Sequence, residues 1–241
     1  MNYAVIFAGG VGKRLNNGVM PKQFLEINGT PIIIHTIKHF ESHKMIDCIV
    51  VACLKESIVC FKKQLENYGI KKVKFVVEGG STALQSQYNA LKTIENNYSL
   101  TNDDIVLIHD GVRPLINEKT ITDCIENVKK YRSAITVSPA IETIFTSNGD
   151  NSVENIISRN DCYLGRAPQG FFIKDIINLH QKAMDDGLRD KSNMFIDSAS
   201  MMKYYGYELH VFEGPAENIK VTTPIDYYTC KALLENKKDL K

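Results

Sequence analysis

Glycines and cations follow the first apolar segment of the chain, a combination suited to holding phosphate groups. The apolar run ends in a turn that contains Gly9, Gly10 and Gly12. Glycines let backbone N–H groups approach an anion closely, and the cationic side chains of Arg14 and Lys22 follow. The stretch therefore predicts a polyphosphate site, and a glycine turn with two surface cations is the simpler alternative.

Two commoner phosphate-binding loops do not match this turn. The Walker loop requires G-x-x-x-x-G-K-[ST], but Gly12 and Lys13 are followed by Arg14, with no glycine at the required distance upstream. The dinucleotide fingerprint requires G-x-G-x-x-G, and here the third glycine is replaced by Leu15. This replacement disfavours a nicotinamide-dependent dehydrogenase.

A second apolar run, residues 105–109, ends in Asp110, Gly111 and Arg113. In open α/β sheets, ligands bind beyond the carboxyl ends of the strands. An aspartate at that position suits Mg²⁺ on a triphosphate, because Mg²⁺ takes one or two carboxylates plus phosphate oxygens. An ordinary Asp-Gly turn is the alternative, and the joint occurrence with the N-terminal glycines favours a nucleotide site.

Two further segments carry weaker signals. Gly79, Gly80 and the hydroxyls after them suit close approach to a base or ribose, and Ser81 or Thr82 also suits the cap of a helix. Lys220 lies in an apolar, β-branched stretch. Taken alone, it is better explained as a solvent-exposed lysine on an edge strand than as a phosphate ligand.

The sequence offers no clear general base, and no Ser-His-Asp or Cys-His arrangement can be placed. A phosphate monoester needs no base, because its second pKa of about 6 leaves it mostly dianionic at neutral pH. Cations, Mg²⁺ and backbone N–H groups would then catalyse phosphoryl-type transfer by positioning and charge stabilisation. His35, His39 and His43 share one helix face opposite the expected buried face, where a solvated polar surface is a better interpretation than a metal site.

Apolar strand patterns alternate with amphipathic helix patterns along the chain, which predicts an α/β fold with a mostly parallel sheet covered on both faces. Residues 138–172 break this alternation with a turn at 148–151, and we expect a protruding β-arm there. The whole chain, 1–241, is expected to form one domain with this arm inserted in it. The expected strands are 3–8, 46–53, 73–77, 105–109, 133–137 and 204–212, and the expected helices 31–43, 55–68, 82–96, 117–132, 174–186 and 225–236.

Bulk properties narrow the class of protein. The chain has 241 residues, 44% hydrophobic residues and a net charge of +1, which argues against a nucleic-acid-binding surface or a polybasic membrane patch. No apolar run reaches membrane-spanning length, and the N-terminus lacks the basic start of a signal peptide. A cytoplasmic location is therefore expected. The six cysteines show no C-x-x-C spacing, and in a chain of this length without a signal peptide reduced thiols are expected.

Taken together and in order, these motifs resemble those of the CTP-dependent sugar-alcohol-phosphate cytidylyltransferases, which include ribitol-5-phosphate and 2-C-methyl-D-erythritol 4-phosphate cytidylyltransferases. The resemblance covers nearly the whole chain, and the combination is specific although each piece alone is not. The segments that carry it are 8–14, 21–24, 109–114, 167–171 and 219–222.

The resemblance implies a Rossmann-like nucleotidyltransferase fold and a homodimer locked by exchanged arms. It implies the reaction of CTP with an alditol phosphate, giving a CDP-alditol and pyrophosphate with Mg²⁺. By motif position, Arg14, Lys22 and Lys220 would be catalytic, and Asp110 would bind the metal. The nucleotide would contact Ala8, Gly9, Gly10, Gly12, Gly80, Ser86 and Asp110, and the acceptor would contact Arg113, Lys220, Thr143 and, from the partner's arm, Arg159.

Departures from the family pattern bear on the acceptor. Ala83 replaces the usual arginine of G-G-x-x-R, and Ala167 replaces the usual threonine of Thr-Pro-Gln. The pair Gly9-Gly10 and the Thr222-Thr223-Pro224 end are more similar to the ribitol branch. Ribitol 5-phosphate is therefore the favoured acceptor, for a cell-surface polymer such as teichoic acid or capsule. The isoprenoid acceptor methylerythritol phosphate, another alditol phosphate and a non-catalytic nucleotide-binding relative are the alternatives.

Overall fold

The fold is built on a seven-stranded sheet. The computed structural model describes residues 1–9, 21–189, 191 and 194–236. The strands lie in the order β11-β7-β10-β6-β1-β4-β5, and all neighbours are parallel except β10, which runs antiparallel to both β6 and β7. Their bounds are β1 (Asn2–Ala8), β4 (Cys48–Cys53), β5 (Val73–Glu78), β6 (Ile105–Asp110), β7 (Ser133–Pro139), β10 (Tyr163–Phe172) and β11 (Val211–Glu213). The expected mostly parallel sheet is confirmed.

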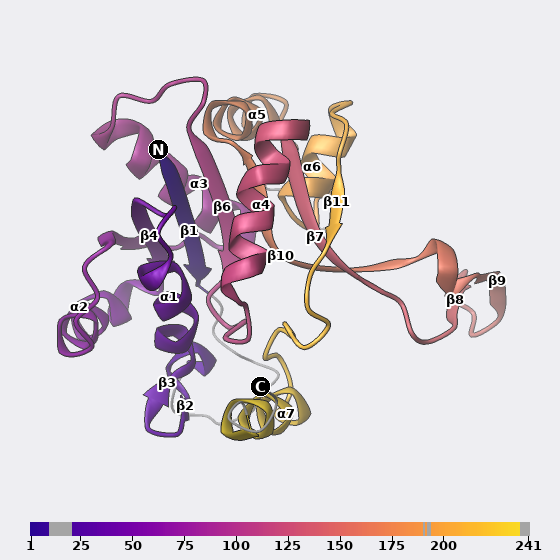
Figure 1. The fold of residues 1–241 in the computed structure, drawn as a ribbon. Coiled ribbons are helices and arrows are strands. Elements are labelled where there is room, and N and C mark those ends of the chain that lie inside the picture. The colour runs from indigo at the N-terminus through magenta and orange to yellow at the C-terminus, as the bar shows by residue number, and fades with distance from the viewer. Residues whose placement is uncertain (10–20, 190, 192–193, 237–241) are drawn as a thin grey trace.

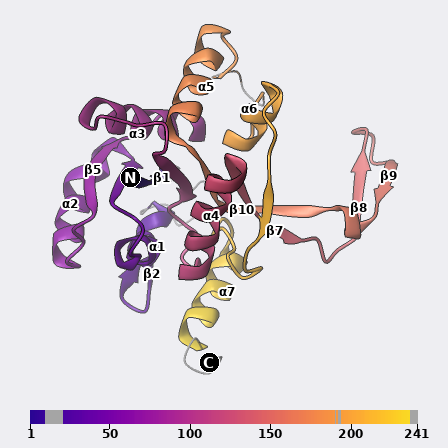
Figure 2. The same cartoon turned by 45° about the horizontal axis from the view of Figure 1, so that its top comes forward.

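Helices cover both faces of this sheet (Figures 1 and 2). Alternate residues of each strand point to opposite faces, so the central strands carry apolar side chains at nearly every position. One face packs against α3 (Ala83–Asn97), α5 (Ile173–Asp185) and α6 (Ser198–Tyr204). The other face packs against α1 (Ile32–Ser42), α2 (Ile58–Asn67) and α4 (Glu118–Tyr131).

A smaller apolar cluster joins the two ends of the chain. The short strands β2 (Glu26–Ile27) and β3 (Thr30–Pro31) lie near the C-terminal helix α7 (Pro224–Glu235), where Ile27, Ile32, Val221 and Cys230 are buried together. This packing brings the segment before α7 back to the carboxyl end of the sheet. Short 3₁₀ turns complete the fold at Lys22–Phe24, Lys55–Ser57 and Arg159–Asp161.

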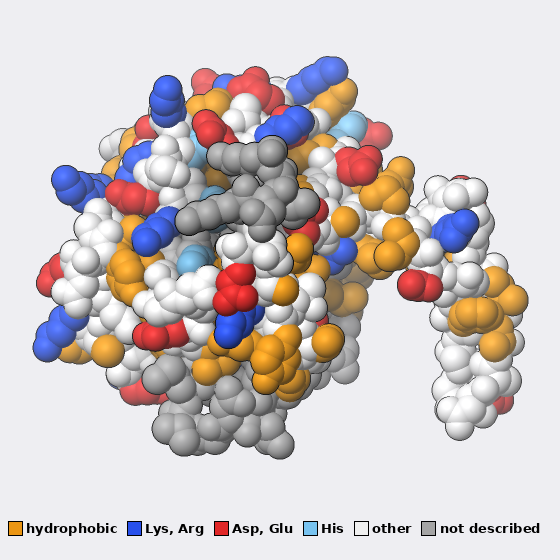
Figure 3. Space-filling model, turned by 60° about the horizontal axis from the view of Figure 1, so that its bottom comes forward, with side chains coloured by type: hydrophobic (Ala, Val, Ile, Leu, Met, Phe, Trp, Pro, Cys, Tyr) orange, Lys and Arg blue, Asp and Glu red, His pale blue; other side chains and the backbone are white. Residues whose placement is uncertain are grey.

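The expected arm is present as a two-stranded extension. The strands β8 (Ile144–Ser147) and β9 (Val153–Ile157) pair with each other and project from the body (Figure 1). Hydrophobic side chains gather on this arm, which stands apart from the rest of the molecule (Figure 3). Phe145, Val153 and Ile156 are each more than half exposed.

The expected arm range of 138–172 also contains a strand of the central sheet. Residues 163–165 of β10 pair with β7 alone, and residues 169–171 pair with both β6 and β7, with a register shift between Gly165 and Gln169. The glycine and proline of this segment resemble turn residues, which is why the pattern concealed a long strand. The projecting part is therefore shorter than the predicted range.

The expected strand at 204–212 is mostly wrong. Residues 198–204 form the helix α6, and only Val211–Glu213 forms a strand. Asp197 caps α6 in a reciprocal pair with Ser200, and this capping box starts a helix too short for its periodicity to be recognised. Among the described helices, none combines the length and apolar character needed to cross a membrane.

Candidate active site

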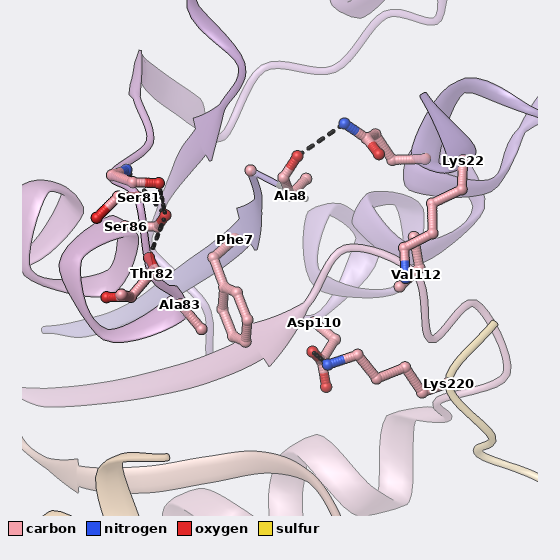
Figure 4. Close-up of a pocket in the computed structure, with 13 residues that line it drawn as sticks. Phe7, Ala8, Lys22, Ser81, Thr82, Ala83, Ser86, Asp110, Val112 and Lys220 are labelled. Atoms are coloured by element: carbon pink, nitrogen blue, oxygen red, sulfur yellow. Dashed lines mark hydrogen bonds and ion pairs between the residues drawn. The ribbon is translucent and has the colours of Figure 1, made fainter. Parts of the chain in front are cut away.

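The carboxyl ends of the neighbouring strands β1 and β6 lie side by side, at the point where the order of the strands in the sheet reverses. The next strand along the chain after β1, β4, pairs with one edge of β1, and the later strand β6 pairs with the other edge. Ligands of open α/β sheets bind beyond the carboxyl ends of the strands at such a reversal of strand order. A pocket of about 180 Å³ lies there, lined on its floor by Phe7, Ala8 and Asp110 (Figure 4).

One wall of this pocket is a glycine turn held by a serine. The Ser86 Oγ accepts a hydrogen bond from the Gly80 N–H at 3.0 Å and donates one to the Thr82 carbonyl at 2.9 Å. A Cβ on Gly9 would lie 3.1 Å from the same oxygen, so the close approach of the two turns favours glycine there. Thr82 caps α3 by accepting from the Gln85 N–H, which confirms the expected cap. Ser86 thus shapes the pocket wall.

The opposite wall carries Lys22. Its neighbour Gln23 is buried and donates a hydrogen bond from Nε2 to the Ala8 carbonyl at 2.7 Å. This bond ties the 3₁₀ turn at residues 22–24 to the end of β1. The Lys22 side chain extends along the pocket toward Val112 (Figure 4).

An ion-paired carboxylate forms the centre of the site. Asp110 Oδ1 lies 2.6 Å from Lys220 Nζ, and its Oδ2 accepts a hydrogen bond from Arg113 Nε at 2.8 Å. Burial opposes ionisation of Asp110, but the charges of Lys220 and Arg113 outweigh it and lower the pKa of this carboxyl to about 2. Asp110 is therefore ionised at neutral pH. Lys220 points at the site, contrary to the edge-strand interpretation.

A second pocket adjoins the first. It has a volume of about 290 Å³ and shares Phe7, Ala83, Asp110 and Lys220 with its neighbour. Its other lining residues include Gln87, Arg113, Arg166, Ala167, Gln169 and Asp197. The Asp110–Lys220 pair consequently stands between two cavities, each open to a different set of polar side chains.

Two buried residues hold this centre in place. Asn218 donates from its side-chain amide to the Ala167 carbonyl at 2.7 Å, and its own carbonyl accepts from Arg113 Nη1 at 2.8 Å. His109 Nε2 contacts the Arg113 carbonyl at 3.3 Å, and because a carbonyl only accepts, Nε2 carries the proton. Burial lowers the pKa of His109 to about 3, so the ring is neutral.

The structure brings together most of the residues predicted for the site. Ala8, Gly9, Lys22, Gly80, Ser86, Asp110 and Lys220 line the first pocket, and Arg113 joins Asp110 and Lys220 in the second. Gly10, Gly12 and Arg14 lie outside the described residues.

Thr143 and Arg159 lie apart from both pockets, on the segments that lead into and out of the arm hairpin. Arg159 Nη1 donates to the Ile141 carbonyl at 3.4 Å, beside a separate cavity of about 380 Å³ at the base of the arm. Within one chain these two residues do not contribute to the site.

Several polar residues of the second pocket were not predicted from the sequence to be site residues. Gln87, Arg166, Gln169 and Asp197 belong to three elements, α3, β10 and the cap of α6, so no local spacing joins them. The cap residue Asp197 was detectable from its capping box, D-x-x-S. Gln87 had only the weak signal of following Ser86 on the expected helix.

The expected solvated face of α1 is wrong. His43 is buried, and His35 and His39 donate to the carbonyls of Ile27 and Pro114 at 2.9 and 3.2 Å. His35 and His39 thereby link α1 to β2 and to the turn after β6. Among the described residues, no group of three or more His, Cys, Asp or Glu side chains is arranged to hold a metal ion.

Comparison with known proteins places these features in one family. The family model described as 2-C-methyl-D-erythritol 4-phosphate cytidylyltransferase matches residues 2–236. The chain belongs to this family. It is accordingly a nucleotidyltransferase with a Rossmann-like fold, as the resemblance implied.

Its relatives carry two different names. The chain is 43% identical over 241 residues to a ribitol-5-phosphate cytidylyltransferase of Vibrio parahaemolyticus, covering 100% of this chain and 99% of the relative. It is 33% identical over 238 residues to a 2-C-methyl-D-erythritol 4-phosphate cytidylyltransferase of Clostridium novyi, with 98% of each covered. A solved 4-diphosphocytidyl-2C-methyl-D-erythritol synthase from Anaerococcus prevotii shares the fold, with a TM-score of 0.80 at 24% identity, covering 97% and 98% of the two chains.

The ion pair makes a prediction about acid stability. The folded pKa of Asp110, about 2, lies below the ordinary value of 3.8, so its ionisation stabilises the fold above pH 4 by about 2 kcal/mol. That contribution is lost as the pH falls from 4 toward 2. Replacing Lys220 with Met should raise the pKa of Asp110, because burial remains while one positive charge is removed.

Urea unfolding of Lys220→Met between pH 2 and 6 should therefore show loss of stability beginning at a higher pH than in the unmodified protein. Lys129→Met is the control, since Lys129 pairs with Glu126 on an exposed helix surface. Identical pH profiles for Lys220→Met and the unmodified protein would contradict the assignment of this ion pair.

Proposed function

We propose that this protein transfers the cytidylyl group of CTP to ribitol 5-phosphate. The observation that carries the proposal is the pair of adjoining pockets that meet at Asp110 and Lys220. A transfer between two phosphorylated substrates requires both to be held with their reacting phosphates in contact, and two adjoining cavities that share a charged pair are suited to this. The similarity to ribitol-5-phosphate cytidylyltransferases, at 43% identity over the full chain, supports this acceptor over methylerythritol phosphate.

In the proposed reaction, an oxygen of the acceptor phosphate attacks the α-phosphorus of CTP. The new P–O bond forms as the bond from the α-phosphorus to the bridging oxygen breaks, and pyrophosphate leaves. Because the attacking phosphate is already anionic, no proton has to be removed. The triphosphate would lie in the first pocket beside Gly9 and Lys22, and Lys220 would stabilise charge where the phosphates meet.

Mg²⁺ is part of the proposal, with Asp110 as its protein ligand. Asp110 suits the ion because its carboxylate is ionised and lies between the two pockets. A single carboxylate is enough when substrate phosphates supply the remaining oxygens, which is a common arrangement for Mg²⁺. The bound ion would neutralise charge on the triphosphate. Asp110 would then exchange its contact with Lys220 for the metal, which frees the ammonium group for phosphate.

The arm supports a homodimer in this proposal. Ile141, Phe145, Val153 and Ile156 expose large apolar side chains on a thin extension that has no core of its own. Such a surface is typical of a subunit contact. A partner's arm would also deliver Arg159, as the resemblance implies. Thr143, expected from the same chain, lines neither of its pockets and would come with Arg159 from the partner.

We further propose that the CDP-ribitol serves the synthesis of a cell-surface polymer such as teichoic acid or capsule, and that the reaction takes place in the cytoplasm. The role of the product rests on the names of the relatives, and the location rests on the composition of the chain. A non-catalytic nucleotide-binding role fits less well, because Lys22, Asp110 and Lys220 converge on one pocket.

The acceptor is tested by pyrophosphate release with CTP and Mg²⁺. Ribitol 5-phosphate should support the highest kcat/KM in a panel that also contains methylerythritol 4-phosphate, glycerol 3-phosphate and the phosphates of xylitol, arabinitol and mannitol. Faster release with methylerythritol 4-phosphate would move the protein to the isoprenoid branch. No release with any acceptor, while CTP still binds, would contradict the proposed activity.

The exchanged arms make a prediction about mixtures of inactive subunits. Lys22→Ala should lose turnover because it removes a cation from the nucleotide pocket, and Arg159→Ala should lose it by removing the partner's contribution. If Arg159 acts in the other subunit, mixed dimers regain one intact site, and randomly mixed subunits should recover about a quarter of the unmodified rate. Pyrophosphate release is measured after the variants are unfolded and refolded together, with each variant refolded alone as the control. No recovery in a refolded mixture that is dimeric would contradict the exchange.

A further inference from the structure

A buried amide in the second pocket has one end without a protein partner. Gln87, on α3, is 2% exposed, and its Oε1 accepts a hydrogen bond from Ser198 Oγ at 2.7 Å. Among the described residues nothing pairs with its Nε2, and the side chain lines the second pocket. The Nε2 itself remains accessible to solvent at the pocket, so a ligand that displaces this water must supply a hydrogen-bond acceptor in its place.

An arginine without a carboxylate faces the same cavity. Arg166, on β10, is half-buried, and its Nε donates to Ser138 Oγ at 3.0 Å. Ser138 is buried, so this bond fixes the guanidinium group against the pocket wall. In the described part of the chain no carboxylate pairs with Arg166, whereas Arg113 nearby is paired with Asp110. The terminal nitrogens of Arg166 are therefore available to a ligand.

The remaining polar lining of the pocket supplies acceptors. Asp197 accepts from Gln169 Nε2 at 2.7 Å and from the Ser200 N–H at 2.8 Å. A carboxylate has about four lone-pair positions, so Asp197 retains capacity for further hydrogen bonds. A wall that combines free donors with free acceptors matches hydroxyl groups, because each hydroxyl both donates and accepts.

We propose that Gln87 and Arg166 are specificity-determining residues that bind the hydroxyl groups of the acceptor alditol. The proposal rests on the proposed function, in which the acceptor phosphate meets the nucleotide at the Asp110–Lys220 pair. Since that pair also borders the second pocket, the carbon chain of the acceptor extends from it toward Gln87 and Arg166.

This arrangement discriminates between ribitol 5-phosphate and methylerythritol 4-phosphate, the two acceptors for which the relatives are named. Ribitol 5-phosphate has one more hydroxyl-bearing carbon than methylerythritol 4-phosphate, whose shorter chain carries a methyl branch. A methyl group against the Gln87 amide or the Arg166 guanidinium would leave a polar group both desolvated and unpaired. Sites built to hydrogen-bond a hydroxyl reject analogues that lack it far more strongly than apolar pockets reject an extra group.

The test compares Gln87→Leu and Arg166→Leu with the unmodified protein. For each, kcat/KM is measured with ribitol 5-phosphate and with methylerythritol 4-phosphate, together with the KM for CTP. Each substitution should lower kcat/KM for ribitol 5-phosphate by about 10- to 100-fold, because a buried hydrogen-bond partner is lost. The ratio of ribitol to methylerythritol activity should fall, and the KM for CTP should stay within a factor of about two.

Ser198→Ala is the matched control, since it removes the protein partner of Gln87 but keeps the amide that faces the pocket. A merely structural role for Gln87 would lower both acceptor activities equally in Gln87→Leu and Ser198→Ala. Arg166→Lys should recover part of the lost activity because it restores a donor without the planar fork. If Gln87→Leu does not fold, Arg166→Leu decides alone.

Unchanged acceptor ratios in both Leu variants, with an unmodified protein that uses ribitol 5-phosphate, would overturn this inference and leave the proposed function standing. An unmodified protein that is inactive with every alditol phosphate would overturn both. The activity of the unmodified protein with alditol phosphates therefore distinguishes failure of this inference from failure of the proposed function.

Discussion

The buried carboxylate of Asp110 is the interaction on which the rest of the site depends. A buried charge is tolerated when it is paired and hydrogen-bonded, and Asp110 has two cationic partners. One of them, Arg113, belongs to the turn after β6, and the other, Lys220, comes from a segment more than a hundred residues later. The pairing therefore joins the carboxyl end of the sheet to the segment before α7. Asn218 strengthens this junction by bonding both Arg113 and β10.

This junction also explains how the fold serves a transfer reaction. Gly9, the 3₁₀ turn at residues 22–24 and the turn after β5 line the first pocket, and β10 with the cap of α6 lines the second. The two cavities share the Asp110–Lys220 pair, where negative phosphates would converge. Fixed cations and backbone donors at such a point stabilise developing charge without reorganising during the reaction. The histidines of α1 and His109 are neutral or backbone-bonded supports of this geometry.

Much of the nucleotide side of the site could be predicted from the sequence because its residues follow strand ends. Gly9 and Asp110 each end an apolar run, and the carboxyl ends of parallel strands meet at one edge. Lys220 could be placed only by family resemblance, since no local pattern shows which distant carboxylate it meets. Gln87 and Arg166 were not predicted at all. They lie on α3 and β10, and these elements form a pocket together only because β10 runs antiparallel between β6 and β7 in the folded sheet. The helix α6 was hidden because it is too short to show a periodic pattern, and the register shift in β10 was hidden by the glycine and proline of that strand.

A crystal structure with a non-hydrolysable CTP analogue, Mg²⁺ and ribitol 5-phosphate would test the central claim most directly. The account predicts the triphosphate beside Gly9 and Lys22, the alditol phosphate in the second pocket, and the α-phosphorus near Lys220. It also predicts that Asp110 contacts the metal. A nucleotide bound away from the ends of β1 and β6, or an acceptor bound outside the pocket that contains Arg113 and Arg166, would contradict it.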